Sequence, residues 1–328
     1  MALTGEGLLM EALHLGDSQA ALFKNSSSRI AIVLASRRRK PSTYTGGTNQ
    51  DGRNHDRDNG ELVAGQQLTS PSVFLDHWAL RIVSDNLALG ERLRRVLEAR
   101  KGTLVVSWAN IAEFSALDQR AARQAEEFLD RQLPRLFFLD FNAFDVIRRE
   151  SELLAGGPPL PPHADLERLV VGLRPAGVRP ITCIGMLTEV SGQRLKSTDR
   201  MKGMFVERTS SLRAEYLDDK EFRTLVDQSL RGQPAPRGTS IILREVVAGL
   251  MRDKTSVITP NDGLDFFHTI VPVAYCDFVL LDGKWRDQVE RVRTRLDRAG
   301  ARFPLATVFS GAEAIEKLIE GLETFERT

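Results

Sequence analysis

The sequence predicts an α/β fold, a three-layer sandwich with a mostly parallel central sheet, a helical insertion and a disordered N-terminal segment. Short apolar runs alternate with longer segments of helical periodicity from about residue 72 to the C-terminus. The runs are nearly continuous in large apolar residues, as in Phe278–Leu281, which is typical of strands buried on both faces of a parallel sheet. Such an alternation places helices on both sides of the strands.

The N-terminal extension, residues 1–71, is expected to be largely disordered. Between about residues 36 and 66 it is rich in Gly, Asn and Asp and nearly free of large apolar side chains. A segment of this composition cannot bury enough surface to offset its ordering entropy.

The first half of the α/β domain spans residues 72–154. A Gly at position 102 is expected to end one helix, and Asn142 is suited to cap another. The expected elements are a strand at Val73–Leu75, a helix at Asn86–Ala99, a strand at Thr103–Ser107, a helix from about Asn110 to Leu133, a strand at Arg135–Leu139 and a helix at Ala143–Leu154.

A Gly/Pro-rich stretch at 156–162 interrupts the alternation, and residues 155–238 are expected to form a mainly helical insertion. The domain then resumes at residues 239–328. Its expected elements are helices at Ser240–Met251 and Asp262–Val273, a strand at Phe278–Leu281, a helix at Asp287–Ala299, a strand at Leu305–Phe309 and a helix at Ala312–Leu322.

Composition excludes several classes of protein. The net charge is +1, from 45 basic and 44 acidic residues, so any affinity for nucleic acid must come from local patches. Two cysteines, Cys183 and Cys276, are too few for a disulfide framework or a Cys-based zinc site. Glu6 and Glu11 lie where an export signal would carry positive charge. We therefore expect a cytoplasmic protein without a membrane partner.

Four carboxylates are expected at one edge of the sheet. Asp76 and Asp282 each follow an apolar strand, while Glu113 and Asp265 lie early in helices. In α/β sheets, ligands bind at the carboxyl ends of the strands. Carboxylates gathered there would repel one another unless a hard divalent cation, Mg²⁺ or Mn²⁺, lies between them. Such ions support phosphodiester hydrolysis.

Other polar residues nearby have simpler explanations. Asn261 or Asp262 is equally well explained as a helix cap. Asp277 precedes its strand, so it is expected at the opposite edge, although it remains a candidate ligand with Asp262. His268 shares a helix face with Asp265, where it could bond a carboxylate or phosphate or serve only the core.

The sequence resembles the PIN-domain nucleases, in particular the larger bacterial PIN-like proteins. The residues that carry the resemblance are Val73–Asp76, Ile111–Phe114, Asn261–His268 and Tyr275–Trp285, within 72–154 and 239–322. The resemblance implies a Mg²⁺- or Mn²⁺-dependent endoribonuclease that uses water as nucleophile and leaves a 5′-phosphate and a 3′-hydroxyl.

Matched position by position, the resemblance makes Asp76, Glu113, Asp265 and Asp282 the catalytic, metal-binding carboxylates. It leaves Asp262 and Asp277 as further candidate ligands. His268, Asn261 and Lys284 are expected to hydrogen-bond the ligands or contact substrate. The chain is roughly twice as long as the small toxin members, so an inhibitor or antitoxin partner does not follow from the resemblance.

Basic residues of the insertion are candidate phosphate contacts: Arg194, Lys196, Arg200 and Lys202. Phe205 and Tyr216 are candidate stacking platforms for bases. The alternative is an ordinary solvated helix surface.

Two other functions stay open. The first is a structure-specific or single-strand DNA nuclease in which the insertion forms an arch over the site. The second is a non-catalytic RNA-binding protein. No phosphate-binding Gly-x-x-x-x-Gly-Lys loop and no Gly-x-Ser-x-Gly nucleophile turn occurs in the sequence.

Overall fold

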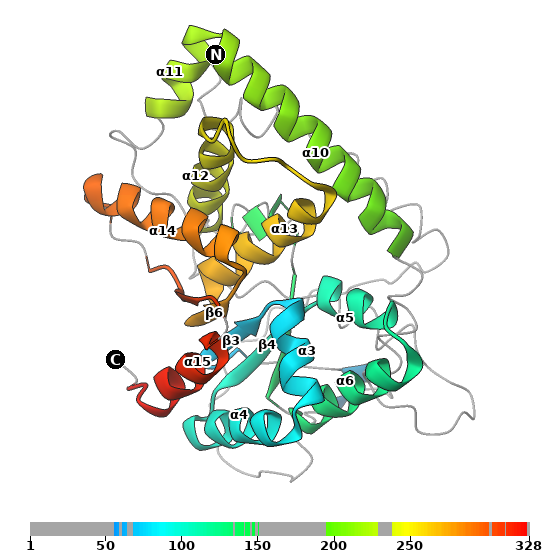
Figure 1. Cartoon of the computed structure of the whole chain (residues 1–328). Coiled ribbons are helices and arrows are strands. Elements are labelled where there is room, and N and C mark those ends of the chain that lie inside the picture. Colours follow the sequence, from blue (N-terminus) through cyan, green and yellow to red (C-terminus); the bar gives the residue numbers. More distant parts are fainter. Residues whose placement is uncertain are drawn as a thin grey trace.

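The computed structural model places five parallel strands in one sheet, in the order β5-β4-β3-β6-β7 (Figure 1). The structure describes residues 56–58, 61–63, 68–133, 135–140, 142–144, 146–147, 150, 195–228, 238–301, 304–311 and 313–326. In these ranges the strands of the sheet are β3 (Ser72–Leu75), β4 (Thr103–Ser107), β5 (Leu136–Leu139), β6 (Phe278–Leu280) and β7 (Thr307–Phe309). The α/β sandwich with a parallel sheet that the sequence predicts is confirmed.

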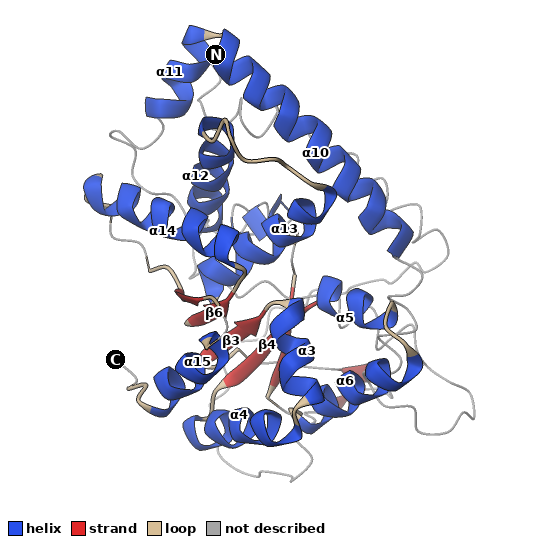
Figure 2. Cartoon of the chain, in the orientation of Figure 1, coloured by secondary structure: helices blue, strands red, loops and turns tan. Residues whose placement is uncertain are grey.

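Helices cover both faces of this sheet (Figures 1 and 2). The helices on one face are α3 (His77–Asp85), α4 (Leu87–Arg100), α5 (Trp108–Ser115), α6 (Gln119–Arg131) and α15 (Ala314–Glu323). Those on the other face are α10 (Leu195–Asp218), α11 (Lys220–Gln228), α12 (Gly238–Arg252), α13 (Pro260–Tyr275) and α14 (Gly283–Arg298).

Side chains of successive strand residues enter two separate cores. Phe74, Val105 and Phe137 pack with α10 to α14, whereas their neighbours Val73 and Leu104 pack with α3 to α6 and α15. All five are fully buried. The period of two along each strand therefore fills both layers from one sheet, and this is why the strands read as continuous apolar runs.

Two helical predictions are wrong in detail. Residues 110–133 were expected to form one helix, but α5 ends at Ser115 and α6 begins after Asp118. The Asp118 carboxylate accepts hydrogen bonds from the N–H groups of Arg120 and Ala121, both at 3.0 Å. Such a cap starts a new helix. Helix α3 was not expected, although buried Ala79, Leu80 and Val83 give it an apolar face.

A small hairpin occurs in a segment predicted to be loop or disordered. Strands β1 (Asp56–Asp58) and β2 (Glu61–Val63) pair antiparallel. The other residues of 1–67 lie outside the described residues, as do 151–194 and 229–237 of the insertion. The predictions made for those segments are therefore not addressed by the structure.

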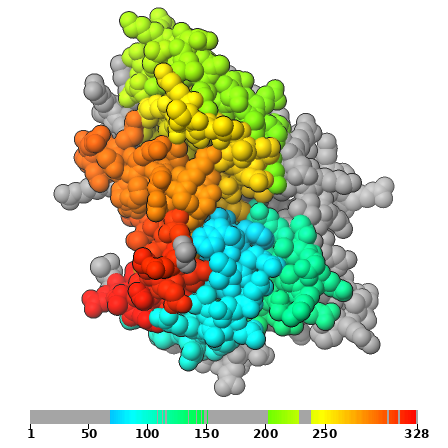
Figure 3. Space-filling view, in the orientation of Figure 1, coloured from blue at the N-terminus to red at the C-terminus, as the bar shows by residue number. Residues whose placement is uncertain are grey.

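The described part of the insertion, α10 and α11, belongs to the main body. Phe205, Leu212 and Tyr216 of α10 lie in the same core cluster as the helices that follow. Helix α10 packs against α12 and α13, and its green atoms lie against the yellow atoms of α13 in Figure 3. This part of the chain does not fold as a separate domain.

None of the helices in the described ranges is both long and apolar enough to cross a membrane.

Candidate functional site

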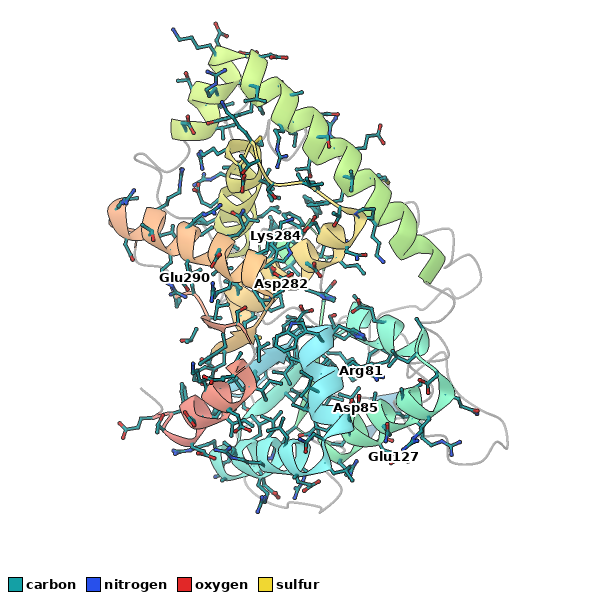
Figure 4. All side chains as sticks on the ribbon, in the orientation of Figure 1. Arg81, Asp85, Glu127, Asp282, Lys284 and Glu290 are labelled. Carbon is teal, nitrogen blue, oxygen red and sulfur yellow. The ribbon has the colours of Figure 1, made fainter. Side chains whose placement is uncertain are left out.

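Two aspartates follow neighbouring strands and begin the helices after them. Asp76 follows β3, and its carboxylate accepts a hydrogen bond of 2.7 Å from the N–H of His77. Asp282 begins α14 and accepts a hydrogen bond of 2.9 Å from the N–H of Trp285 (Figure 4). The N–H of Asp76 donates to the Leu280 carbonyl at 3.0 Å. From β3 the chain continues to one side of the sheet and from β6 to the other. Ligands of open α/β sheets bind at such a reversal.

Glu113 and Asp265 approach this edge from α5 and α13, each as the sixth residue of its helix. Burial, and after it the negative charge of Asp76, raises the pKa of Asp265 to about 7. The charges of Asp282 and Glu113 act in the same direction, whereas His268 opposes them. Charges shift a pKa in this way only over short distances. The charges of Asp76, Asp282 and Glu113 therefore all act on Asp265, and we call these four carboxylates the acidic cluster.

Asp282 experiences the same environment. Burial is the largest effect and raises its pKa, and the charge of Asp76 adds to it. Hydrogen bonds from the N–H groups of Trp285 and Lys284, with the charge of Lys284, act in the opposite direction. The acidic cluster thus favours either protonated acids or a counter-ion.

His268 connects three elements around Asp76. It is 1% exposed, with Nε2 3.1 Å from Ser107 Oγ and Nδ1 3.5 Å from Asp76 Oδ1. Ser107 Oγ also lies 3.0 Å from Asn110 Oδ1, so the hydroxyl can donate to Asn110 while it accepts from the imidazole. Burial lowers the pKa of His268, but Asp76, Glu113 and Asp265 outweigh burial and the pKa is raised. The neighbouring carboxylates thus favour the protonated, cationic form of His268.

His77 is a member of this site that the sequence analysis missed. Its Nδ1 lies 3.6 Å from Glu113 Oε2, and neither of these two buried atoms has a hydrogen-bond partner among the described residues. Burial lowers the pKa of His77, and the charges of Glu113 and Asp76 partly oppose this. Its position next to Asp76 in the sequence could have indicated that it belongs to the site. Because helix α3 was not predicted, nothing in the sequence placed His77 near Glu113.

The acidic cluster has the donor chemistry of a site for a hard divalent cation. It offers oxygen ligands, excess negative charge and, in Glu113 Oε2, a buried acceptor that receives no hydrogen bond from the described residues. In the described part of the chain, no three His, Cys, Asp or Glu side chains already form a metal-binding group. Cation binding would therefore have to draw the carboxylates closer together.

Asp262 and Lys284 form an ion pair beside the cluster. The second oxygen of Asp262 accepts hydrogen bonds from Thr259 N–H and Oγ1, at 2.6 and 2.9 Å, at the start of α13. Burial raises the pKa of Asp262, but the bonds from Lys284 and Thr259 outweigh it and the pKa is lowered. Both carboxylate oxygens of Asp262 therefore already have hydrogen-bonding or ion-pair partners, which argues against the metal-ligand role considered for this residue. Asn261 is exposed in the first turn of α13.

Asp277 lies at the opposite edge of the sheet, as its position before the strand indicated. Its Oδ2 accepts hydrogen bonds from Ser72 N–H at 2.7 Å and from Ser72 Oγ at 2.9 Å. These bonds join the starts of β6 and β3. The structure therefore excludes Asp277 from the acidic cluster and gives it a structural contact.

The basic residues proposed to contact phosphate are only partly described. Arg194 lies outside the described residues, and the same holds for the side chains of Lys196 and Arg200. Lys202 lies where α10 crosses the first turn of α13, since a Cβ added to Gly263 would stand 3.3 Å from Lys202 Cα. Of the four, Lys202 is the one that the structure places next to the helix carrying Asp265.

Phe205 and Tyr216 are not stacking platforms. They are 1% and 7% exposed, and the Phe205 ring packs on Phe266 with centroids 4.9 Å apart. Both aromatic rings were predicted to face substrate because they lie in a basic segment. They instead form the apolar side of α10, and the prediction is wrong.

No family model, curated protein or solved structure matches this chain.

Proposed function

We propose that this protein is a Mg²⁺- or Mn²⁺-dependent endoribonuclease of the PIN type, with the acidic cluster as its active site. The observation that carries the proposal is a group of four acidic residues from four elements around the reversal point of the sheet, where burial and, after it, the charges of Asp76, Asp282 and Glu113 raise the pKa of Asp265 to about 7. An acidic cluster of this kind, with perturbed pKa values, is a frequent property of catalytic sites.

The residues have distinct roles in this proposal. Asp76, Asp282, Asp265 and Glu113 hold the cation. Asp76 and Asp282 are oriented by the helix N–H groups that they accept, and His268 steadies Asp76 from α13. When bound, Mg²⁺ or Mn²⁺ supplies positive charge at the phosphate and activates water near neutral pH. Protonation of Asp265 competes with cation binding, so binding below about pH 7 releases a proton.

The packing of α10 argues against α10 as the arch of a structure-specific DNA nuclease. A DNA arch has to stand clear of the body so that a strand can pass beneath it. Helix α10 instead packs along α12 and α13 through buried Phe205 and Leu212. Its described part therefore leaves no passage between itself and α13.

Cleavage assays on the purified full chain test the proposal. Labelled single-stranded RNA, DNA of the same sequence and a DNA flap are incubated with Mn²⁺ or Mg²⁺ and with wild type, Asp76→Asn or Asp282→Asn. Asparagine keeps the helix cap, so the fold should persist while RNA cleavage falls at least about a hundredfold, near 3 kcal/mol of lost transition-state stabilisation. Asp85→Asn, at the exposed end of α3, is the matched control and should cleave like wild type.

Full cleavage by both variants would contradict the proposed site. Faster cleavage of the flap than of RNA would favour the DNA nuclease. Failure of wild type to cut any substrate, together with no heat of Mn²⁺ binding at millimolar metal in calorimetry, would favour the non-catalytic RNA-binding protein.

A further inference from the structure

Two potential metal-donor atoms at the rim of the acidic cluster lack partners. Glu113 Oε2 and His77 Nδ1 have almost no accessible surface and no hydrogen-bond partner among the described residues. Buried polar atoms in folded proteins nearly always have a partner. These two atoms face each other at ion-pair distance without forming a hydrogen bond, and this arrangement needs an explanation.

The separation of these two atoms fits ligands of a common ion. They are 3.6 Å apart, which is longer than a hydrogen bond between nitrogen and oxygen. Two donors bound to one ion at about 2.1 Å each stand roughly 3.0–3.5 Å apart. A shift of a few tenths of an ångström would bring both into one coordination sphere.

Packing holds the His77 ring in this position. His77 is the first residue of α3, directly after Asp76. Its ring lies against Phe114, the residue after Glu113, with centroids 5.3 Å apart and planes at 49°. The side chains of His77 and Glu113 keep 26% and 28% of their surface exposed, so both residues lie near solvent although their two donor atoms are covered.

We infer that His77 is a nitrogen ligand of the active-site metal and that it makes the site prefer Mn²⁺ to Mg²⁺. This inference rests on the proposed function, because it assumes that the acidic cluster binds a divalent cation. Both ions take oxygen ligands, but Mn²⁺ is less hard than Mg²⁺ and accepts an imidazole nitrogen more readily. A site that offered only carboxylate oxygens would have no nitrogen ligand to favour Mn²⁺ over Mg²⁺.

Spectroscopy and calorimetry on the metal-free full chain test the inference. Electron spin-echo spectra of bound Mn²⁺ should show coupling to imidazole ¹⁴N in wild type and should lose it in His77→Gln. Titration calorimetry with MnCl₂ and MgCl₂ should show Mn²⁺ affinity reduced at least about tenfold in His77→Gln and Mg²⁺ affinity within about twofold of wild type. His77→Asp restores an oxygen ligand, so it should bind both metals without nitrogen coupling.

Thermal melts followed by circular dichroism establish that each variant folds, and Asp85→Asn serves as the matched control on the same helix. Nitrogen coupling that persists in His77→Gln, or equal losses of affinity for both metals, would overturn the inference. Wild type that binds Mn²⁺ and cleaves RNA without nitrogen coupling would also overturn it and leave the proposed function intact. Wild type that neither binds Mn²⁺ nor cleaves RNA would instead remove the proposed function.

Discussion

Asp265 occupies a position at which ionisation opposes folding. Its pKa is about 7 in the folded chain against an ordinary value of 3.8, so the folded state holds a proton that the unfolded state releases. Its contribution to stability is therefore lost as pH rises from about 3.8 through about 7. A bound cation would remove this penalty by compensating the charge.

Replacement of Asp265 by Asn should stabilise the metal-free protein at alkaline pH. Thermal melts in EDTA at about pH 5 and about pH 8 should show a gain for Asp265→Asn that grows by on the order of 2–3 kcal/mol between them, because the interval from pH 5 to the folded pKa of about 7 spans about two units, each worth about 1.4 kcal/mol. Added Mn²⁺ should stabilise wild type more than the variant. An equal difference in melting temperature at both pH values would show that Asp265 does not carry the strained charge.

The crossing of α10 over α13 depends on a glycine. A Cβ on Gly263 would meet Phe205 Cβ at 3.2 Å and Lys202 Cα at 3.3 Å, and the backbone of α10 cannot yield as a flexible side chain can. Further along, Phe266 packs on Phe205 and, edge-on, on Trp285 of α14. Three helices are thereby fixed around the turn that carries Asp265.

Two glycine substitutions in this region should have opposite effects. Gly263→Val should destabilise the protein by about 1–3 kcal/mol, since the crossing is already tight. Gly203→Ala on α10, where a Cβ would have nothing within 4 Å, should stabilise it by about 0.5–1 kcal/mol through helix propensity. Urea denaturation measures both changes. Stabilisation by Gly263→Val would show that α10 does not lie against α13 in solution.

Elements with strong periodicity could be predicted, and short ones could not. Helix α4, for example, has an apolar stripe over several turns that a window of residues detects. Helix α3 has nine residues, and Asp76 is its N-cap. Because Asp76 was interpreted as a metal ligand, its second role as a helix cap was not predicted. The break between α5 and α6 depends on the Asp118 cap, a local hydrogen bond that interrupts an apolar pattern otherwise continuous in sequence.

The two edges of the sheet differ in the interactions that their aspartates make. Asp76 and Asp282 lie at the carboxyl ends of β3 and β6, and Asp277 joins the starts of the same strands. The carboxylates at the first edge repel one another, whereas Asp277 is satisfied by two donors from Ser72. One edge of the sheet thus carries carboxylates that repel one another, whereas the opposite edge carries an aspartate whose hydrogen bonds join two strands.

Asp277→Ala should therefore weaken the fold without disabling the site. Loss of its bonds leaves the buried N–H of Ser72 without an acceptor, at a cost of about 1–3 kcal/mol. Below the melting temperature, cleavage of RNA per folded molecule should stay within about twofold of wild type, because mutations distant from a site act additively. Guanidinium unfolding and initial cleavage rates measure the two effects. A hundredfold loss of cleavage in a folded variant would contradict this separation.

That Asp76 and Asp282 share an edge of the sheet followed from chain order and strand polarity, because residues that directly follow neighbouring parallel strands lie at the same edge. The partners inside the site did not follow. That His268 bonds Ser107 and Asp76, or that His77 meets Glu113, depends on how α5 and α13 are oriented in space. The commitment of Asp262 to Thr259 and Lys284 likewise appears only when α13 and α14 are placed together.

The order of the sheet also governs when the acidic cluster can be completed during synthesis of the chain. Strand β3 is made early, yet its partner on one side is β6, some two hundred residues later in the chain. A nascent chain that ends before β6 leaves one flank of β3 unpaired and lacks Asp282, the carboxylate that follows β6. Under the proposed function, the messenger being translated would therefore not meet a complete acidic cluster until that late part of the polypeptide has emerged.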